Sequence, residues 1–217
     1  MDNSPGIARI WRHLPDRAAL HTPFLVAGSQ TELILKEGTH IKIIENGAHS
    51  LIRVDENTTF AMADYLDTGV IQPGKDYYVY ELNFIPAVKT LPLLISLNST
   101  FPLGATATNS RKIGGFHTLC CAVGTIPGHP GSGFATGAII PNSVWCLNWR
   151  SRGLQAGMAY NAKAGKWGFI YGGSGTGINT ASAYGAVLTN SRNQMDCADD
   201  LAAVGCRFLS GCAGRPP

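Results

Sequence analysis

The sequence predicts a protein of the α+β class that is mostly β, with a small N-terminal antiparallel β unit followed by a larger, loop-rich domain. Its 217 residues include 26 glycines and 12 prolines, and only 14% are charged, which favours turns and short strands over long helices. The hydrophobic content of 45% is too high for a disordered chain. Alternating apolar residues follow Thr31, and glycine, proline and asparagine interrupt short apolar pieces from Asn98 to Arg152.

The length suits one large domain or two small ones. We predict an N-terminal arm at residues 1–30, a small antiparallel β domain at 31–86 and a second domain at 87–217. The arm carries isolated large apolar residues such as Trp11, which cannot form a core by themselves. We therefore expect the arm to pack on the next domain or on a neighbouring subunit.

Strands of the first β domain are predicted from alternation and turn residues. Apolar residues alternate between positions 33 and 43, and Asn46-Gly47 separates this run from the next one, which predicts a hairpin. Residues 75–82 are aromatic and β-branched and predict a further strand. The run Leu91–Leu97 is continuously apolar, which is typical of a strand covered on both faces.

The second domain is predicted to contain a hairpin and a final strand. Residues 157–160 and 166–171 are the two hairpin strands, and Leu201–Leu209 is the final buried strand. The glycine-rich stretch Gly172–Gly177 lacks the lysine of a phosphate loop and the third glycine of a dinucleotide fingerprint. A surface loop is predicted there.

Several function classes are disfavoured. The formal charge of +3 is scattered, so nucleic acid is not an expected partner. No apolar run approaches the roughly 20 residues of a membrane span, so we expect no membrane insertion. Met1–Pro5 lacks the features of a signal peptide, so we expect synthesis in the cytoplasm, where cysteines remain free thiols. No Cys-x-x-Cys pair occurs, and Pro141-Asn142 lacks an adjacent acidic calcium ligand, so we expect neither a metal nor another cofactor. His117 is expected to be a hydrogen-bonded imidazole beside a packed thiol.

Two runs in the central region carry a family resemblance. The sequences NSRKIGGFHTLC (109–120) and IIPNSVWCLNWRSRGLQAGMAY (139–160) resemble the body of tailed-phage receptor-binding proteins of the major tropism determinant type. The resemblance implies a C-type-lectin-like fold for residues 87–217, related to that of formylglycine-generating enzymes. The layout from Tyr171 to Leu209 is similar to the variable region and final strand of that family.

The resemblance implies a virion protein of the phage tail, made in the host cytoplasm. It would attach the particle to a bacterial surface receptor, protein or glycan, through the loop surface at residues 172–200. Other tail proteins would be further partners, and the arm at residues 1–30 would dock on the virion or on a neighbouring subunit. A homotrimer is expected because fibre-tip proteins of this resemblance are trimeric. The loop is rich in small polar residues and contains tyrosine, a composition typical of adaptable contact surfaces. The predicted receptor contacts are Thr176, Asn179, Tyr184, Asn190, Arg192 and Asn193.

Two alternatives remain open. One is a structural tail or capsid-attachment protein with the same fold and no receptor role. The other is an oxidase of the formylglycine-generating type, which would use Cys146 with Cys120 or Cys121. Apolar neighbours surround these cysteines, so we expect them to be packing residues. No Gly-x-Ser-x-Gly nucleophile elbow occurs either. We therefore expect that the protein is not an enzyme.

Overall fold

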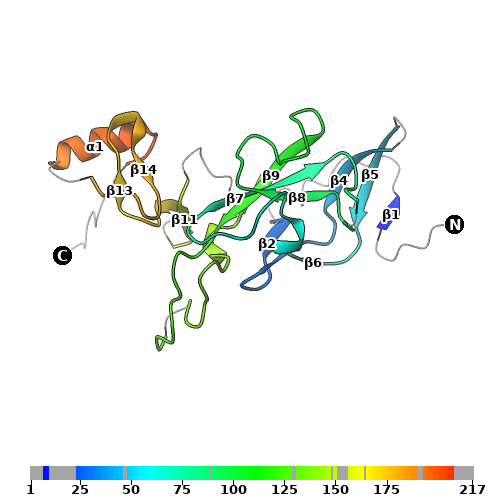
Figure 1. Ribbon diagram of the computed structural model, residues 1–217, viewed down its shortest axis with the longest axis horizontal. Helices are drawn as coiled ribbons and strands as arrows, with labels where there is room; N and C mark the ends of the chain where they lie inside the picture. Colours follow the sequence, from blue (N-terminus) through cyan, green and yellow to red (C-terminus); the bar gives the residue numbers. More distant parts are fainter. Residues whose placement is uncertain are drawn as a thin grey trace, which may run out of the picture.

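The computed structural model describes residues 7–9, 23–45, 48–87, 89–128, 131–147, 149–150, 156–163, 165–189 and 193–207. The described chain is mostly β, with several small antiparallel sheets and one α-helix, in agreement with the predicted class. In Figure 1 the first strand lies toward one end of the long axis and the helix lies toward the other. No helix in the described part of the chain is long and apolar enough to cross a membrane.

Two three-stranded antiparallel sheets form from the first part of the chain. One has the order β1 (Ile7–Arg9), β5 (Ala48–Val54), β4 (His40–Glu45), and the other has the order β2 (Leu25–Ala27), β3 (Glu32–Leu35), β6 (Thr58–Ala61). The predicted hairpin is confirmed, because β4 and β5 pair up to Glu45 and Ala48 on either side of Asn46-Gly47. Both described pieces of the predicted arm, β1 and β2, pair with strands of these sheets.

A four-stranded antiparallel sheet forms the middle of the molecule. Its order is β10 (Trp145–Cys146), β9 (Ser110–His117), β7 (Asp76–Leu82), β8 (Leu93–Ser96). The strands predicted at 75–82 and 91–97 are both confirmed, and all four residues of β8 are buried, as expected of a strand covered on both faces. The pairing of β7 with β9 brings Asp76 opposite His117, which matters for the site described below.

Glycine allows the close approach of β10 and β7 to β9. A Cβ atom on Gly114 would lie 2.5 Å from the carbonyl oxygen of Trp145, and one on Gly115 would lie 2.6 Å from that of Tyr77. Any side chain at these two positions would therefore push the neighbouring backbone away.

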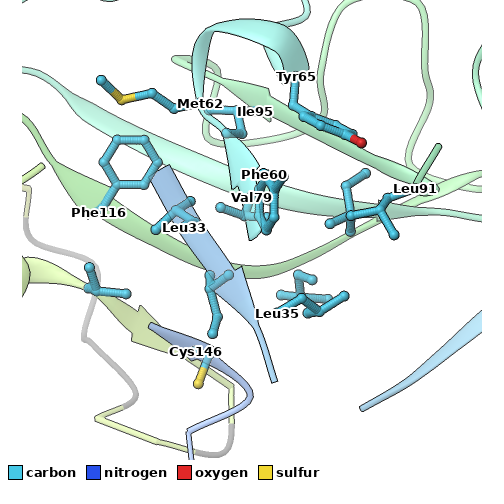
Figure 2. Packing of buried hydrophobic residues seen from close by; sticks show 14 of the residues in the cluster. Leu33, Leu35, Phe60, Met62, Tyr65, Val79, Leu91, Ile95, Phe116 and Cys146 are labelled. Atoms are coloured by element: carbon cyan, nitrogen blue, oxygen red, sulfur yellow. The ribbon is translucent and has the colours of Figure 1, made fainter. Parts of the chain in front are cut away.

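One hydrophobic core connects these sheets. Leu33 of β3 and Phe60 of β6 pack in the same buried cluster as Val79, Ile95 and Phe116 of the four-stranded sheet (Figure 2). The sheet and the core both include residues from either side of position 86, so a division there would separate hydrogen-bonded strands. The division at 1–30, 31–86 and 87–217 stays a prediction.

The last described part of the chain contains two small hairpins and the helix. The predicted hairpin is confirmed as β11 (Met158–Asn161) and β12 (Lys166–Phe169), and β13 (Gly173–Ser174) pairs with β14 (Ala181–Ser182). The buried strand predicted at Leu201–Leu209 is wrong for all its described residues, because Gln194–Ala203 forms the helix α1, residues 204–207 form no strand and none of residues 201–207 is buried. Residues 208 and 209 lie outside the described part of the chain.

Candidate functional site

Four of the six predicted contact residues are described, and they lie in or next to the β13–β14 hairpin and at the start of α1, elements that Figure 1 shows close together. Tyr184 follows β14 and half of its surface is exposed, at 50%. Thr176 and Asn179 lie at the two ends of a short 3₁₀ turn, Gly177–Asn179, and both are exposed. Asn190 and Arg192 lie outside the described residues.

Asn193 has a structural role at the start of α1. Its side chain accepts a hydrogen bond from the backbone N–H of Asp196 at 2.9 Å, and the Asp196 carboxylate accepts one from the N–H of Asn193 at 3.4 Å. This reciprocal arrangement is a capping box, which satisfies N–H groups that have no partner within the helix. A substitution of Asn193 would therefore change the helix as well as any contact that it makes.

Apolar side chains are exposed on the same surface. Ile178 is 83% exposed and Val187 is 87% exposed, and Leu188, which follows Val187, is also exposed. The surrounding residues are small and polar. Exposed apolar groups within a polar rim are typical of protein surfaces that contact a partner.

A buried polar chain fixes the start of this surface to the four-stranded sheet. Asp76 of β7 contacts His117 of β9 at 2.9 Å between Oδ1 and Nδ1, and His117 Nε2 lies 2.9 Å from the hydroxyl of Tyr171. The side chains of Asp76 and His117 are almost completely buried. Because the carboxylate accepts from Nδ1–H, a neutral imidazole has its Nε2 lone pair available to accept from the Tyr171 hydroxyl.

Burial also keeps Tyr171 protonated. Burial raises the pKa of Tyr171, and the neighbouring Cys120 thiol and the Asp76 carboxylate raise it further. The phenol is thus neutral and remains a hydrogen-bond donor at physiological pH. The expectation of a hydrogen-bonded imidazole at His117 is confirmed.

Gly157 joins the polar chain to β14. Its N–H donates to Asp76 Oδ2 at 2.8 Å, and its carbonyl accepts from the hydroxyl of Ser182 at 2.9 Å. The same Ser182 oxygen accepts from the N–H of Tyr171 at 3.0 Å. Gly157 has φ of 64°, and a Cβ atom there would lie 2.1 Å from the Ser182 carbonyl oxygen, so only glycine fits.

Tyr184 packs against the ring of Tyr171 and against the backbone at Gly74. Its ring centroid lies 5.9 Å from that of Tyr171, and the two rings are tilted by 42°. A Cβ atom on Gly74 would lie 2.7 Å from Cβ of Tyr184, so this tyrosine packs directly against the backbone that precedes β7. An exposed aromatic side chain is therefore held on a rigid support, which lowers the entropic cost of binding.

The three central cysteines lie in different environments. Cys146 is completely buried in the core, Cys120 is half-buried and Cys121 is exposed, with the two neighbouring Sγ atoms 3.7 Å apart. The expectation that all three are packing residues is therefore confirmed for Cys146 and wrong for Cys121. Because Cys146 is fully buried, it does not share an accessible groove with Cys120 or Cys121, as the oxidase alternative requires.

Sequence reasoning did not identify Asp76, Tyr171, Gly157 or Ser182 as parts of the site. Asp76 and His117 are 41 residues apart, and His117 and Tyr171 are 54 residues apart. Residues so far apart in the sequence form no local motif from which this network could be predicted. Of the two glycines next to it, Gly74 was predicted as a turn residue and Gly157 as the first residue of a hairpin strand.

Comparisons with known proteins give consistent results. The family model described as "Mtd second domain" matches residues 23–146. The solved structure "Major Tropism Determinant U1 Variant" matches with a TM-score of 0.60 and 21% identity over 86% of this chain and 50% of that chain. The I1 variant matches with a TM-score of 0.60 and 21% identity over 93% and 53%. The P3c variant matches with a TM-score of 0.57 and 19% identity over 93% and 53%.

The extent of these matches differs along the chain. The family model ends at Cys146, so both strands of the β13–β14 hairpin and α1 lie beyond it. The chain spans about half the length of the solved structures that it matches. At this identity the structural matches establish a common fold. Comparison with curated proteins finds no match.

Proposed function

Because the chain belongs to the major tropism determinant (Mtd) family, we propose that it is a tail-fibre protein of a phage virion that attaches the particle to a receptor on a bacterial surface. The solved relatives are named as variants of a determinant of tropism, which is the choice of host. The proposal transfers that role to this chain. Membership agrees with the resemblance of residues 109–120 and 139–160.

The observation that carries the proposal is the rigidly supported, exposed surface around Tyr184. The contact surface is assigned to residues 172–200, with Thr176, Asn179, Tyr184 and Asn193 in the described part and Asn190 and Arg192 outside it. Support comes from the exposure of Tyr184 and from the buried chain that connects Tyr171 to β7 and β9. A fixed scaffold beneath variable surface side chains would let specificity change without loss of the fold.

The finer parts of the proposal are a C-type-lectin-like fold for residues 87–217 and a homotrimeric assembly with other tail proteins. The short hairpins, irregular segments, 3₁₀ turns and α-helix found in the described residues after β9 support such a fold. The bacterial receptor would be a protein or a glycan. No catalytic role is proposed.

A structural tail protein is the second candidate, and one observation favours it. Ile178, Val187 and Leu188 are exposed, and apolar side chains of this kind also pack against permanent virion partners. The two candidates differ in whether this surface is free in the particle. They also differ in what happens to adsorption when the surface is changed.

The test is phage adsorption with Tyr184→Ala. Truncation of a central tyrosine in an interface costs about 2 kcal/mol, which corresponds to roughly a 30-fold loss of affinity. We expect slower adsorption at temperatures where the variant is fully folded, and a somewhat lower melting temperature because the Tyr184 ring contacts Gly74 and Tyr171. The matched control is Lys163→Ala on the turn of the β11–β12 hairpin, an exposed residue outside the assigned surface. Unchanged adsorption of the Tyr184 variant would favour the structural candidate.

A further inference from the structure

A hollow of about 420 Å³ lies beside Tyr184. One wall comes from residues 72–78 and Leu97, and the other comes from residues 156–157 and 182–184. Sites for small molecules have volumes of roughly 300–1,000 Å³, so the hollow has room for a ligand of one or two rings but not for a folded peptide segment. Tyr78 and Tyr184 line it from opposite walls.

The two walls are held together before any ligand binds. The Asp76 carboxylate on one wall accepts from the N–H of Gly157 on the other at 2.8 Å, and Ser182 bonds Gly157 in turn. The backbone N–H of Lys75 donates to the hydroxyl of Thr118 at 3.0 Å, which fixes the segment between Gly74 and β7. A preformed hollow of this kind costs a ligand little ordering entropy.

The exposed charged group in the lining of this hollow is the ammonium group of Lys75. Lys75 is exposed, and none of the described carboxylates forms an ion pair with it. Asp76 is the one acidic residue among the described lining residues, and its two oxygens accept hydrogen bonds from His117 and Gly157. The Asp76 carboxylate is thus almost completely buried and occupied within the protein, whereas the ammonium group of Lys75 is exposed to a ligand.

The lining also offers groups suited to a sugar ring. The exposed ring of Tyr184 is an apolar surface on which the C–H face of a pyranose packs, while the exposed side-chain amide of Gln72 provides a donor and an acceptor for hydroxyl groups. A carboxylate on the sugar would pair with Lys75. Neutral sugars would lack that contact.

We propose that this hollow binds an acidic sugar, a uronic acid or a similar carboxylate-bearing unit, of a bacterial surface glycan. The inference deepens the proposed receptor role and rests on it. Lys75 selects for the carboxylate, and Tyr184 provides the stacking surface for every sugar that binds.

The test uses the full chain in titration calorimetry with oligosaccharides of glucuronic, galacturonic and mannuronic acid. Each is compared with its carboxyl-reduced, neutral counterpart. We expect at least one acidic oligosaccharide to bind about tenfold more tightly than its neutral form. This ratio corresponds to a difference in binding free energy of about 1.4 kcal/mol, which we assign to the ion pair with Lys75. Lys75→Gln should remove this preference and leave binding of the neutral form unchanged. Tyr184→Ala should weaken binding of both forms, and Lys163→Gln should change neither.

Equal binding of the acidic and neutral forms, binding of neither, or a Lys75→Gln variant that keeps the preference would overturn the inference. Adsorption assays with phage carrying the same variants distinguish failure of the acidic-sugar inference from failure of the proposed receptor role. If Tyr184→Ala slows adsorption while no acidic sugar binds, the receptor role stands and the acidic-sugar assignment fails. If acidic sugars bind while neither variant slows adsorption, the hollow is a sugar site and the receptor role fails.

Discussion

Gly157 shows at the scale of one residue how the candidate site depends on backbone geometry. Its positive φ and its contact with the Ser182 carbonyl leave no room for a side chain. We expect Gly157→Ala to lower the free energy of unfolding by about 1–3 kcal/mol, measured by urea denaturation. The matched control is Gly168→Ala in β12, where a Cβ atom would meet nothing within 4 Å. Equal effects of the two substitutions would contradict the assigned role of Gly157.

Substitutions of Asn193 can distinguish its role as a helix cap from a role in receptor contact. Loss of the cap in Asn193→Ala should cost about 1 kcal/mol of stability, whereas Asn193→Ser keeps a capping oxygen and should cost much less. If the amide also contacts the receptor, the serine variant should adsorb more slowly at unchanged melting temperature. Normal adsorption by the serine variant would remove Asn193 from the contact surface and leave it a structural residue.

At the scale of one element, the stability that β7 contributes should depend on pH through Tyr80. Burial raises the pKa of Tyr80 to about 12, with smaller contributions from Tyr78 and Asp67, and the hydroxyl donates to the carbonyl of Asn98 at 2.6 Å. A raised pKa means that the folded state holds the proton more tightly than the unfolded state does. The resulting stability is fully present below the ordinary tyrosine pKa of about 10 and is lost as the pH rises through 12.

We therefore expect the free energy of unfolding to fall between pH 10 and pH 12 and to fall less steeply in Tyr80→Phe. Denaturation curves at closely spaced pH values measure both slopes. Burial also raises the pKa of Tyr77, so some of the decline should persist in the variant. Identical slopes in the two proteins would show that Tyr80 ionises equally easily in the folded and unfolded states.

Individual elements were predictable where local pattern determines them. The strands β7 and β8 and the β4–β5 and β11–β12 hairpins all follow from alternation, apolar runs and turn residues. The helix α1 was missed because its last apolar residues were assigned to a strand. Asn193 and Asp196, three residues apart, are the capping-box signal that would have indicated it.

Arrangements at the scale of the whole molecule depend on contacts between distant residues. The pairing of β7 with β9 and the chain from Asp76 through His117 to Tyr171 join positions that no local pattern relates. The sequence therefore predicted the class and the family, and it identified Tyr184 as a candidate contact. It did not predict the large core that crosses residue 86, nor the buried network beneath Tyr184.

A homotrimer is the expectation for the assembled protein. Exposed apolar side chains are spread over the described surface, among them Val70 and Leu103 as well as those near Tyr184. Burial of such groups between subunits favours association, and a symmetric trimer would let weak single contacts hold a cell surface through multivalency. Sedimentation equilibrium should give the mass of three chains of 23.0 kDa. A stable monomer at micromolar concentration would refute this expectation.

Reconstruction of the intact virion by electron microscopy tests the central claim most directly. It would locate this chain in the particle and show which way the surface at residues 172–189 faces. The receptor-binding account predicts that this surface, with Tyr184 and the hollow beside it, points away from the particle and is free of other phage proteins. Burial of Tyr184 against another virion protein would contradict that account and support a structural role in the tail.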